Sequence, residues 1–135
     1  MRKALFFLAM LASGLSAASG DNTGPIAAVT PTEAHARVKS GEAVLVDVRE
    51  PEEWAEGVAE GARLLPLSDL KADRSEWKKT LSGPREKELI LYCRSGRRSA
   101  MAAEILAKEG FKVANAGGFE SWEKAGLPVK KPEQK

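Results

Sequence analysis

The sequence predicts a three-layer α/β domain, with a five-stranded parallel sheet and helices on both of its faces. Apolar runs of strand length alternate with helical patterns along the chain, as is typical of a parallel sheet. Two of the runs, at residues 43–48 and 89–92, lack polar alternation, which indicates strands buried on both faces. The 135 residues suffice for one domain with a core and are too few for two.

The N-terminal residues have the pattern of a secretory signal peptide. Arg2 and Lys3 precede an apolar run at residues 4–15, and small residues follow at 16–20. We expect cleavage after Ala18 and export to a bacterial periplasm, although an uncleaved membrane anchor stays open. The apolar run is too short to span a bilayer. The predicted division of the chain is a signal peptide at residues 1–18, a linker at 19–25, the domain at 26–129 and a tail at 130–135.

Charge and composition exclude several functions for the exported chain. The chain without residues 1–18 has 19 basic and 19 acidic side chains, so its formal net charge is zero. The basicity of the full sequence therefore gives no reason to expect nucleic-acid binding. The single cysteine excludes an internal disulfide. We expect a monomer that does not bind a membrane after signal removal, needs neither a metal nor another cofactor, and acts on small molecules.

The elements of the domain follow from apolar patterns and from punctuating glycines and prolines. Five short runs are the predicted strands: residues 26–29, 43–48, 62–65, 89–92 and 111–114. Helical segments are predicted at residues 31–39, from Pro51 onward, in parts of 68–81, after Ser99 and at 119–125. For the first of these helices, Thr30 fits the N-cap and Glu33 the capping-box partner. Residues 115–118 are predicted to be a tight connection.

Several polar and aromatic side chains outside residues 93–98 are expected to serve the fold. Asp47 and Arg49 lie where the second strand ends, and we expect them to tie the following loop through ion pairs and caps. Trp54 is predicted to point inward and Trp77 to be half-buried. His35, the only histidine, is expected to be solvated on its helix rather than paired with the cysteine.

The candidate site is the loop between the strand at 89–92 and the helix that follows. It contains the only cysteine, Cys93, followed by Arg94, Ser95, Gly96, Arg97 and Arg98. A tight loop that leads into a helix N-terminus directs backbone N–H groups and the positive end of the helix dipole inward. The stretch therefore predicts an anion-binding loop around a thiol, which we expect at the surface of the domain.

The residue types of this loop indicate the chemistry. A helix N-terminus and neighbouring arginines lower the pKa of a thiol, so Cys93 is expected to be an ionised nucleophile. Gly96 permits the positive φ that inward-facing N–H groups often require. Arg94 and Arg97 are predicted to contact an incoming anion, whereas Arg98 is equally suited to turn inward and fix the loop.

Four segments together resemble a single-domain rhodanese of the small periplasmic type. They are Val46-Asp47-Val48-Arg49 with Glu53-Trp54, Gly61-Ala62 with Leu65-Pro66, the loop from Cys93 to Ser99, and Gly117-Gly118-Phe119 with Trp122 and Gly126-Leu127-Pro128. The resemblance covers roughly residues 26–129. It implies a thiosulfate sulfurtransferase that moves a sulfane sulfur through a persulfide of Cys93 to cyanide or a thiol.

One departure from the family and two alternative functions accompany this resemblance. The family usually has Gly-His-Ile where this chain has Gly57-Val58-Ala59, which affects local structure or substrate access more than catalysis. A cysteine phosphatase or arsenate reductase uses a similar thiolate, but phosphatases have Cys-x5-Arg, and Cys93 to Arg98 is Cys-x4-Arg. A non-catalytic sulfur-carrier or partner-binding module is the second alternative.

Overall fold

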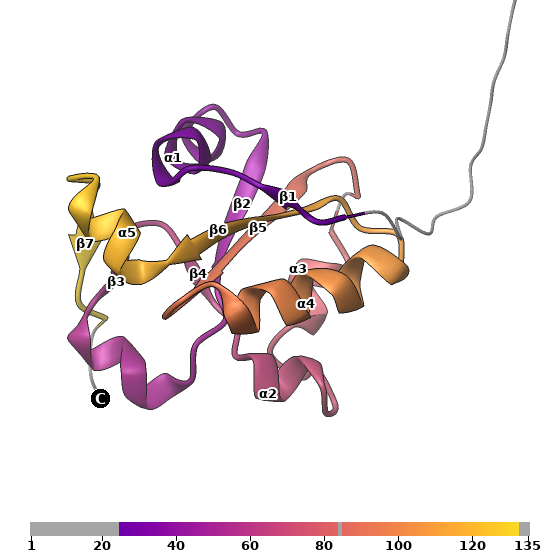
Figure 1. The fold of residues 1–135 in the computed structure, drawn as a ribbon. Helices are drawn as coiled ribbons and strands as arrows, with labels where there is room; N and C mark the ends of the chain where they lie inside the picture. The colour runs from indigo at the N-terminus through magenta and orange to yellow at the C-terminus, as the bar shows by residue number, and fades with distance from the viewer. Residues whose placement is uncertain (1–24, 84, 133–135) are drawn as a thin grey trace, which may run out of the picture.

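The computed structural model describes residues 25–83 and 85–132, and Figure 1 shows their arrangement. The predicted signal peptide and most of the predicted linker lie outside the described residues. Within the described part of the chain, no helix is long and apolar enough to cross a membrane.

A five-stranded parallel sheet forms the middle layer, as the sequence predicts. Its strands lie in the order β1-β6-β5-β2-β4, and every neighbouring pair is parallel. Their bounds are Ala27–Ala28 for β1, Ala43–Asp47 for β2, Arg63–Leu64 for β4, Glu88–Cys93 for β5 and Val113–Gly118 for β6. The central strand, β5, therefore carries the candidate site, since Cys93 is its last residue.

Helices cover both faces of this sheet (Figure 1). Their bounds are Pro31–Lys39 for α1, the 3-10 helix Pro51–Glu56 for η1, Leu67–Leu70 for α2, Lys78–Leu81 for α3, Arg97–Lys108 for α4 and Phe119–Lys124 for α5. Helix α1 lies with α5 on one face, and α4 lies with α2 on the other. The predicted capping box of α1 is confirmed, because Thr30 Oγ1 accepts from the Glu33 N–H at 3.0 Å.

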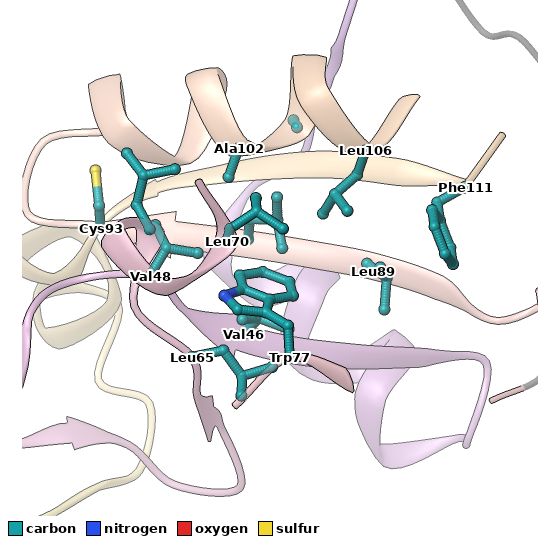
Figure 2. Packing of buried hydrophobic residues seen from close by; sticks show 13 residues of the cluster. Val46, Val48, Leu65, Leu70, Trp77, Leu89, Cys93, Ala102, Leu106 and Phe111 are labelled. Atoms are coloured by element: carbon teal, nitrogen blue, oxygen red, sulfur yellow. The ribbon is translucent and has the colours of Figure 1, made fainter. Parts of the chain in front are cut away.

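Alternate residues of the central strands fill two separate cores. On the α4 face, β5 contributes Leu89, Leu91 and Cys93, whereas on the α1 face it contributes Ile90 and Tyr92. This is the period of two that a strand covered on both faces requires. Figure 2 shows Cys93 at one end of the first core, with its sulfur toward the start of the helix that carries Ala102 and Leu106.

A buried ion pair closes the end of β2, as predicted for Asp47 and Arg49. Their side chains are 0% and 1% exposed, and Arg49 Nη2 lies 2.8 Å from Asp47 Oδ2. The same nitrogen donates to the Gly57 carbonyl at 2.7 Å, which ties the segment after η1 to the sheet. The guanidinium also lies 4.5 Å from the Phe119 ring centroid.

Three expectations about individual segments are wrong. Trp77 is fully buried rather than half-buried, because its Nε1 donates to the Pro66 carbonyl at 2.8 Å and its ring joins the α4-side core. His35 is half-buried rather than solvated, and its ring packs edge-on against Trp122 with centroids 5.7 Å apart; as expected, it is not paired with Cys93, whose sulfur contacts Gly96 and Ser99. Residues 115–118 continue β6 instead of forming a tight connection.

The structure also has a second, two-stranded sheet, which the sequence does not predict. Strand β3, Val58–Ala59, pairs antiparallel with β7, Val129–Lys130. Val58 and Ala59 are buried, at 2% and 0% exposure, so the residues that replace the family's His-Ile form a packed strand. The chain after α5 thereby returns to the segment that follows η1.

The end of β6 makes a close contact with the backbone of the loop that follows β5. Between β5 and β6 the register shifts, so that Leu91 opposes Asn115 but Cys93 opposes Gly118. A Cβ atom on Gly118 would overlap the Arg94 carbonyl oxygen. Only glycine at position 118 therefore lets the loop lie against the sheet in this way.

We predict that Gly118→Ala pushes the Arg94 backbone away from β6 and lowers stability by about 1–3 kcal/mol, because no flexible side chain can yield there. The displaced loop should also slow alkylation of Cys93 at neutral pH. Urea unfolding and iodoacetamide labelling measure the two effects. Gly126→Ala is the control for labelling. Its φ of +75° strains an alanine, but its Cβ meets no atom within 4 Å. Wild-type labelling in Gly118→Ala would contradict the predicted contact.

Candidate active site

Cys93 lies at the carboxyl end of a central strand, where open parallel sheets gather their functional groups. Its side chain is 0% exposed and belongs to the core between the sheet and α4. The expectation of a surface position is therefore wrong. The strand's alternation explains the burial, because Cys93 continues the apolar row of Leu89 and Leu91.

Backbone N–H groups of the loop surround the sulfur as predicted. Gly96 has a φ of +96°, and its N–H donates to Cys93 Sγ at 3.0 Å. Burial raises the pKa of the Cys93 thiol, but hydrogen bonds from Ser99 and from the backbone N–H groups of Ser95 and Gly96 outweigh it. The pKa therefore lies below its ordinary value. The main source of this effect is the ring of donors rather than the arginine charges.

Two polar residues that sequence reasoning missed complete the surroundings of the sulfur. Ser99 Oγ is buried, 3.5 Å from Cys93 Sγ and 2.7 Å from Asn115 Oδ1. Asn115 on β6 also donates from Nδ2 to the Gly96 carbonyl at 3.0 Å. The period-two pattern of β6 places Asn115 on the face of Cys93, but the extension of β6 past residue 114 has no sequence signal.

The three arginines of the loop differ in what they contact. Arg98 turns inward, and its Nη1 and Nη2 donate to the Glu53 carboxylate at 2.6 and 2.9 Å. This hydrogen bonding lowers the pKa of Glu53 to about 2. Arg94 is 61% exposed, with its Nε 3.4 Å from Glu53 Oε1 and its Nη2 3.7 Å from Glu56 Oε2. Arg97 is exposed and pairs with no carboxylate in the described part of the chain.

A cavity of about 440 Å³ opens beside the loop. Its lining residues are Arg49, Glu56, Arg94, Phe119, Glu120 and Glu123. Arg94 comes directly after Cys93 and Phe119 directly after Gly118, so the cavity lies at the same end of the central strands as the thiol. A small anion or a thiol has room there, next to the loop.

This arrangement suits a nucleophilic sulfur atom that is neutral as a thiol and negatively charged as a thiolate. Several hydrogen-bond donors hold a negative sulfur atom, and no carboxylate or imidazole hydrogen-bonds to Sγ among the described residues. A thiol with a lowered pKa needs no base to become a thiolate near neutral pH. The site can therefore attack an electrophilic sulfur and then hold the product anion in the same ring of donors.

Comparisons with known proteins show the family to which this domain belongs. Residues 30–125 match the rhodanese-like domain. A sulfurtransferase of Allochromatium vinosum is 37% identical over 92 residues, which cover 67% of this chain and 80% of that protein. A putative mitochondrial thiosulfate sulfurtransferase of Schizosaccharomyces pombe is 40% identical over 87 residues, which cover 58% of this chain and 60% of that protein.

A solved structure shows the same fold. It is a protein of unknown function from Rhodopseudomonas palustris, described as a possible tyrosine phosphatase, with 32% identity and a TM-score of 0.67. The match covers 78% of this chain and 85% of that one. The matched domain spans most of the sheet and both helical layers described above. The chain belongs to the rhodanese family, the sulfurtransferases built on this domain.

Proposed function

We propose that this rhodanese-family sulfurtransferase takes the sulfane sulfur of thiosulfate onto Cys93 and passes it to cyanide or a thiol. The observation that carries the proposal is the buried thiol with a lowered pKa, held by the Gly96 N–H at 3.0 Å. The name of the Schizosaccharomyces pombe relative favours thiosulfate as the donor. The predicted signal peptide favours a periplasmic place of action, and we expect a monomer there.

In the first half-reaction the Cys93 thiolate attacks the outer sulfur of thiosulfate. An S–S bond forms at Sγ, the bond within thiosulfate breaks, and its electron pair leaves with sulfite. The product is a persulfide anion whose charge lies mainly on the outer sulfur. Backbone N–H groups of Ser95 and Gly96 already point to Sγ, and they favour the anion at both ends of this step.

In the second half-reaction cyanide or a thiolate attacks the outer sulfur of the persulfide. The new bond forms to that sulfur, the S–S bond breaks, and its electron pair returns to Cys93 Sγ. The step is a thiol–disulfide exchange in form, so it depends on how well the loop holds Sγ as a leaving thiolate. Because Cys93 is 0% exposed, thiosulfate reaches Sγ in the first half-reaction only after the covering groups move.

Arg98 supports sulfur transfer over phosphatase chemistry. A cysteine phosphatase ends its loop on an arginine that binds the phosphate oxygens in a bidentate manner. Here Arg98 is one position too early, and both of its terminal nitrogens are bound to Glu53. A non-catalytic carrier module would form the same loop but turn over slowly with thiosulfate and cyanide. Aryl phosphate hydrolysis and thiocyanate formation separate the three functions.

We predict that Cys93→Ala abolishes sulfite release from thiosulfate and thiocyanate formation, because the nucleophile is gone. The buried thiol also packs in the core, so the variant should lose about 1–2 kcal/mol of stability while keeping its fold. Steady-state kinetics and urea unfolding check both effects. Val46→Ala, in the same core, is the control that should lose stability and keep activity. Sulfite release by Cys93→Ala at a substantial rate would exclude Cys93 as the nucleophile.

We predict that Arg97→Ala raises KM for thiosulfate about ten- to a hundredfold with little change in kcat, since a charge-assisted contact to the dianion is lost. Arg94→Ala is the matched control and should have a smaller effect, because Glu53 and Glu56 already lie beside its guanidinium. Added salt should raise KM in the parent more than in Arg97→Ala. Equal KM values for the parent and Arg97→Ala would show that Arg97 does not bind the donor.

A further inference from the structure

The Ser99 hydroxyl has one proton and two acceptors beside it. Asn115 Oδ1 lies 2.7 Å from Ser99 Oγ, and Cys93 Sγ lies 3.5 Å from the same oxygen. Ser99 is 0% exposed, so bulk water does not compete for the proton. When Sγ is neutral, the shorter contact to an amide oxygen is the stronger hydrogen bond.

Backbone groups fix which atom of the Asn115 amide faces Ser99. Nδ2 donates to the Gly96 carbonyl at 3.0 Å, and Oδ1 accepts from the Gly117 N–H at 3.0 Å. The register shift between β5 and β6 frees the Gly117 N–H from the strand ladder, which explains why a side chain meets it. A flipped amide would set donor against donor and acceptor against acceptor. Oδ1 is therefore held as an acceptor toward Ser99.

The same contact opposes donation from Ser99 to sulfur. When the proton turns to Sγ, Ser99 Oγ and Asn115 Oδ1 face each other at 2.7 Å with no hydrogen between them. Two oxygen lone pairs at that distance repel. Asn115 and Cys93 thus compete for one proton, and a full negative charge on Sγ makes the sulfur the better acceptor.

We propose that Asn115 is a positioning residue that directs the Ser99 proton to Oδ1 while Cys93 Sγ is neutral and yields it to Sγ when the sulfur becomes a thiolate. This inference deepens the proposed sulfur transfer and rests on it. In the persulfide the charge lies on the outer sulfur, so the Ser99 proton returns to Asn115. When an acceptor removes the outer sulfur, the electron pair of the broken S–S bond arrives on Sγ, and the proton of Ser99 turns to meet it.

The competition has a use, since a thiolate that is held too well is a poor nucleophile. Intrinsic nucleophilicity of a thiolate falls as its pKa falls, and the best attacking thiol has a pKa near the ambient pH. The N–H groups of the loop already hold the pKa of Cys93 low. Asn115 draws the Ser99 proton away from the sulfur while Sγ is neutral. It thereby limits the lowering of the Cys93 pKa and keeps the thiolate reactive.

The test measures the pH profile of alkylation of Cys93 by iodoacetamide in the parent, Ser99→Ala, Asn115→Ala and the double variant. Cys93 is the only cysteine, so the label reports on it alone, and no sulfur donor is needed. The alkylation result can therefore contradict the role of Asn115 while sulfur transfer is still observed. It can equally support that role when no sulfur transfer is observed. Arg94, Arg97, Arg98 and Glu53, the charged groups nearest the loop, are unchanged throughout, so their influence on the pKa cancels.

The two single variants should shift the apparent pKa of Cys93 in opposite directions. Ser99→Ala loses a donor to the thiolate, so the apparent pKa rises and labelling at a pH below it slows about tenfold. Asn115→Ala frees the Ser99 proton for the sulfur, so the apparent pKa falls and labelling at that pH quickens about three- to tenfold. In the double variant the effect of Asn115→Ala should vanish, because no hydroxyl remains to redirect.

A rise of the apparent pKa in Asn115→Ala, or an effect that persists without Ser99, would overturn the inference and leave Asn115 as a brace of the loop. Asn115→Ser is the second variant. Its shorter side chain can still accept from the Gly117 N–H, two residues ahead, but lacks the amide that meets Ser99. It should lower the apparent pKa like Asn115→Ala while preserving the strand. Unfolding of both variants would also contradict the inference, since Asn115 would then serve the fold.

Discussion

The backbone contact between the Cys93–Arg98 loop and the end of β6 is the constraint on which the site depends. Gly118 leaves no space for a Cβ beside the Arg94 carbonyl, and a Cβ on Gly96 would lie 3.3 Å from Gly117 Cα. The loop can therefore lie directly on the sheet, where the Gly96 N–H points at the sulfur at 3.0 Å. Gly96 and Gly118 thus make a ring of donors possible at the end of a strand that is otherwise packed with apolar side chains.

Two ion pairs connect the elements around the loop. Buried Arg49 joins β2 to the Gly57 carbonyl and lies over the Phe119 ring, so one side chain connects β2, the segment after η1 and α5. Glu53 joins η1 to the start of α4 through Arg98. Removal of one partner from a buried pair leaves an uncompensated charge, which is why such pairs fix geometry more than they add stability.

Sequence reasoning predicts the parallel sheet, the capped first helix and the loop around Cys93, because these depend on local patterns and on glycine and proline positions. It does not predict the burial of Trp77 or Cys93, since burial depends on which elements pack together. The inward turn of Arg98 depends on Glu53, which lies on a different element. Asn115 reaches the site because β6 continues beside β5 past residue 114, and neither that extension nor the pairing of β3 with β7 leaves a periodic signal.

The central claim is that Cys93 carries a sulfur atom between two half-reactions, and mass spectrometry tests it most directly. After incubation with thiosulfate, the protein should gain the mass of one sulfur atom on the peptide that contains Cys93, its only cysteine. Cyanide should remove the added mass and yield an equal amount of thiocyanate. A protein that releases sulfite or thiocyanate catalytically with no sulfur adduct on Cys93, or that never gains the adduct at any donor concentration, would contradict the account.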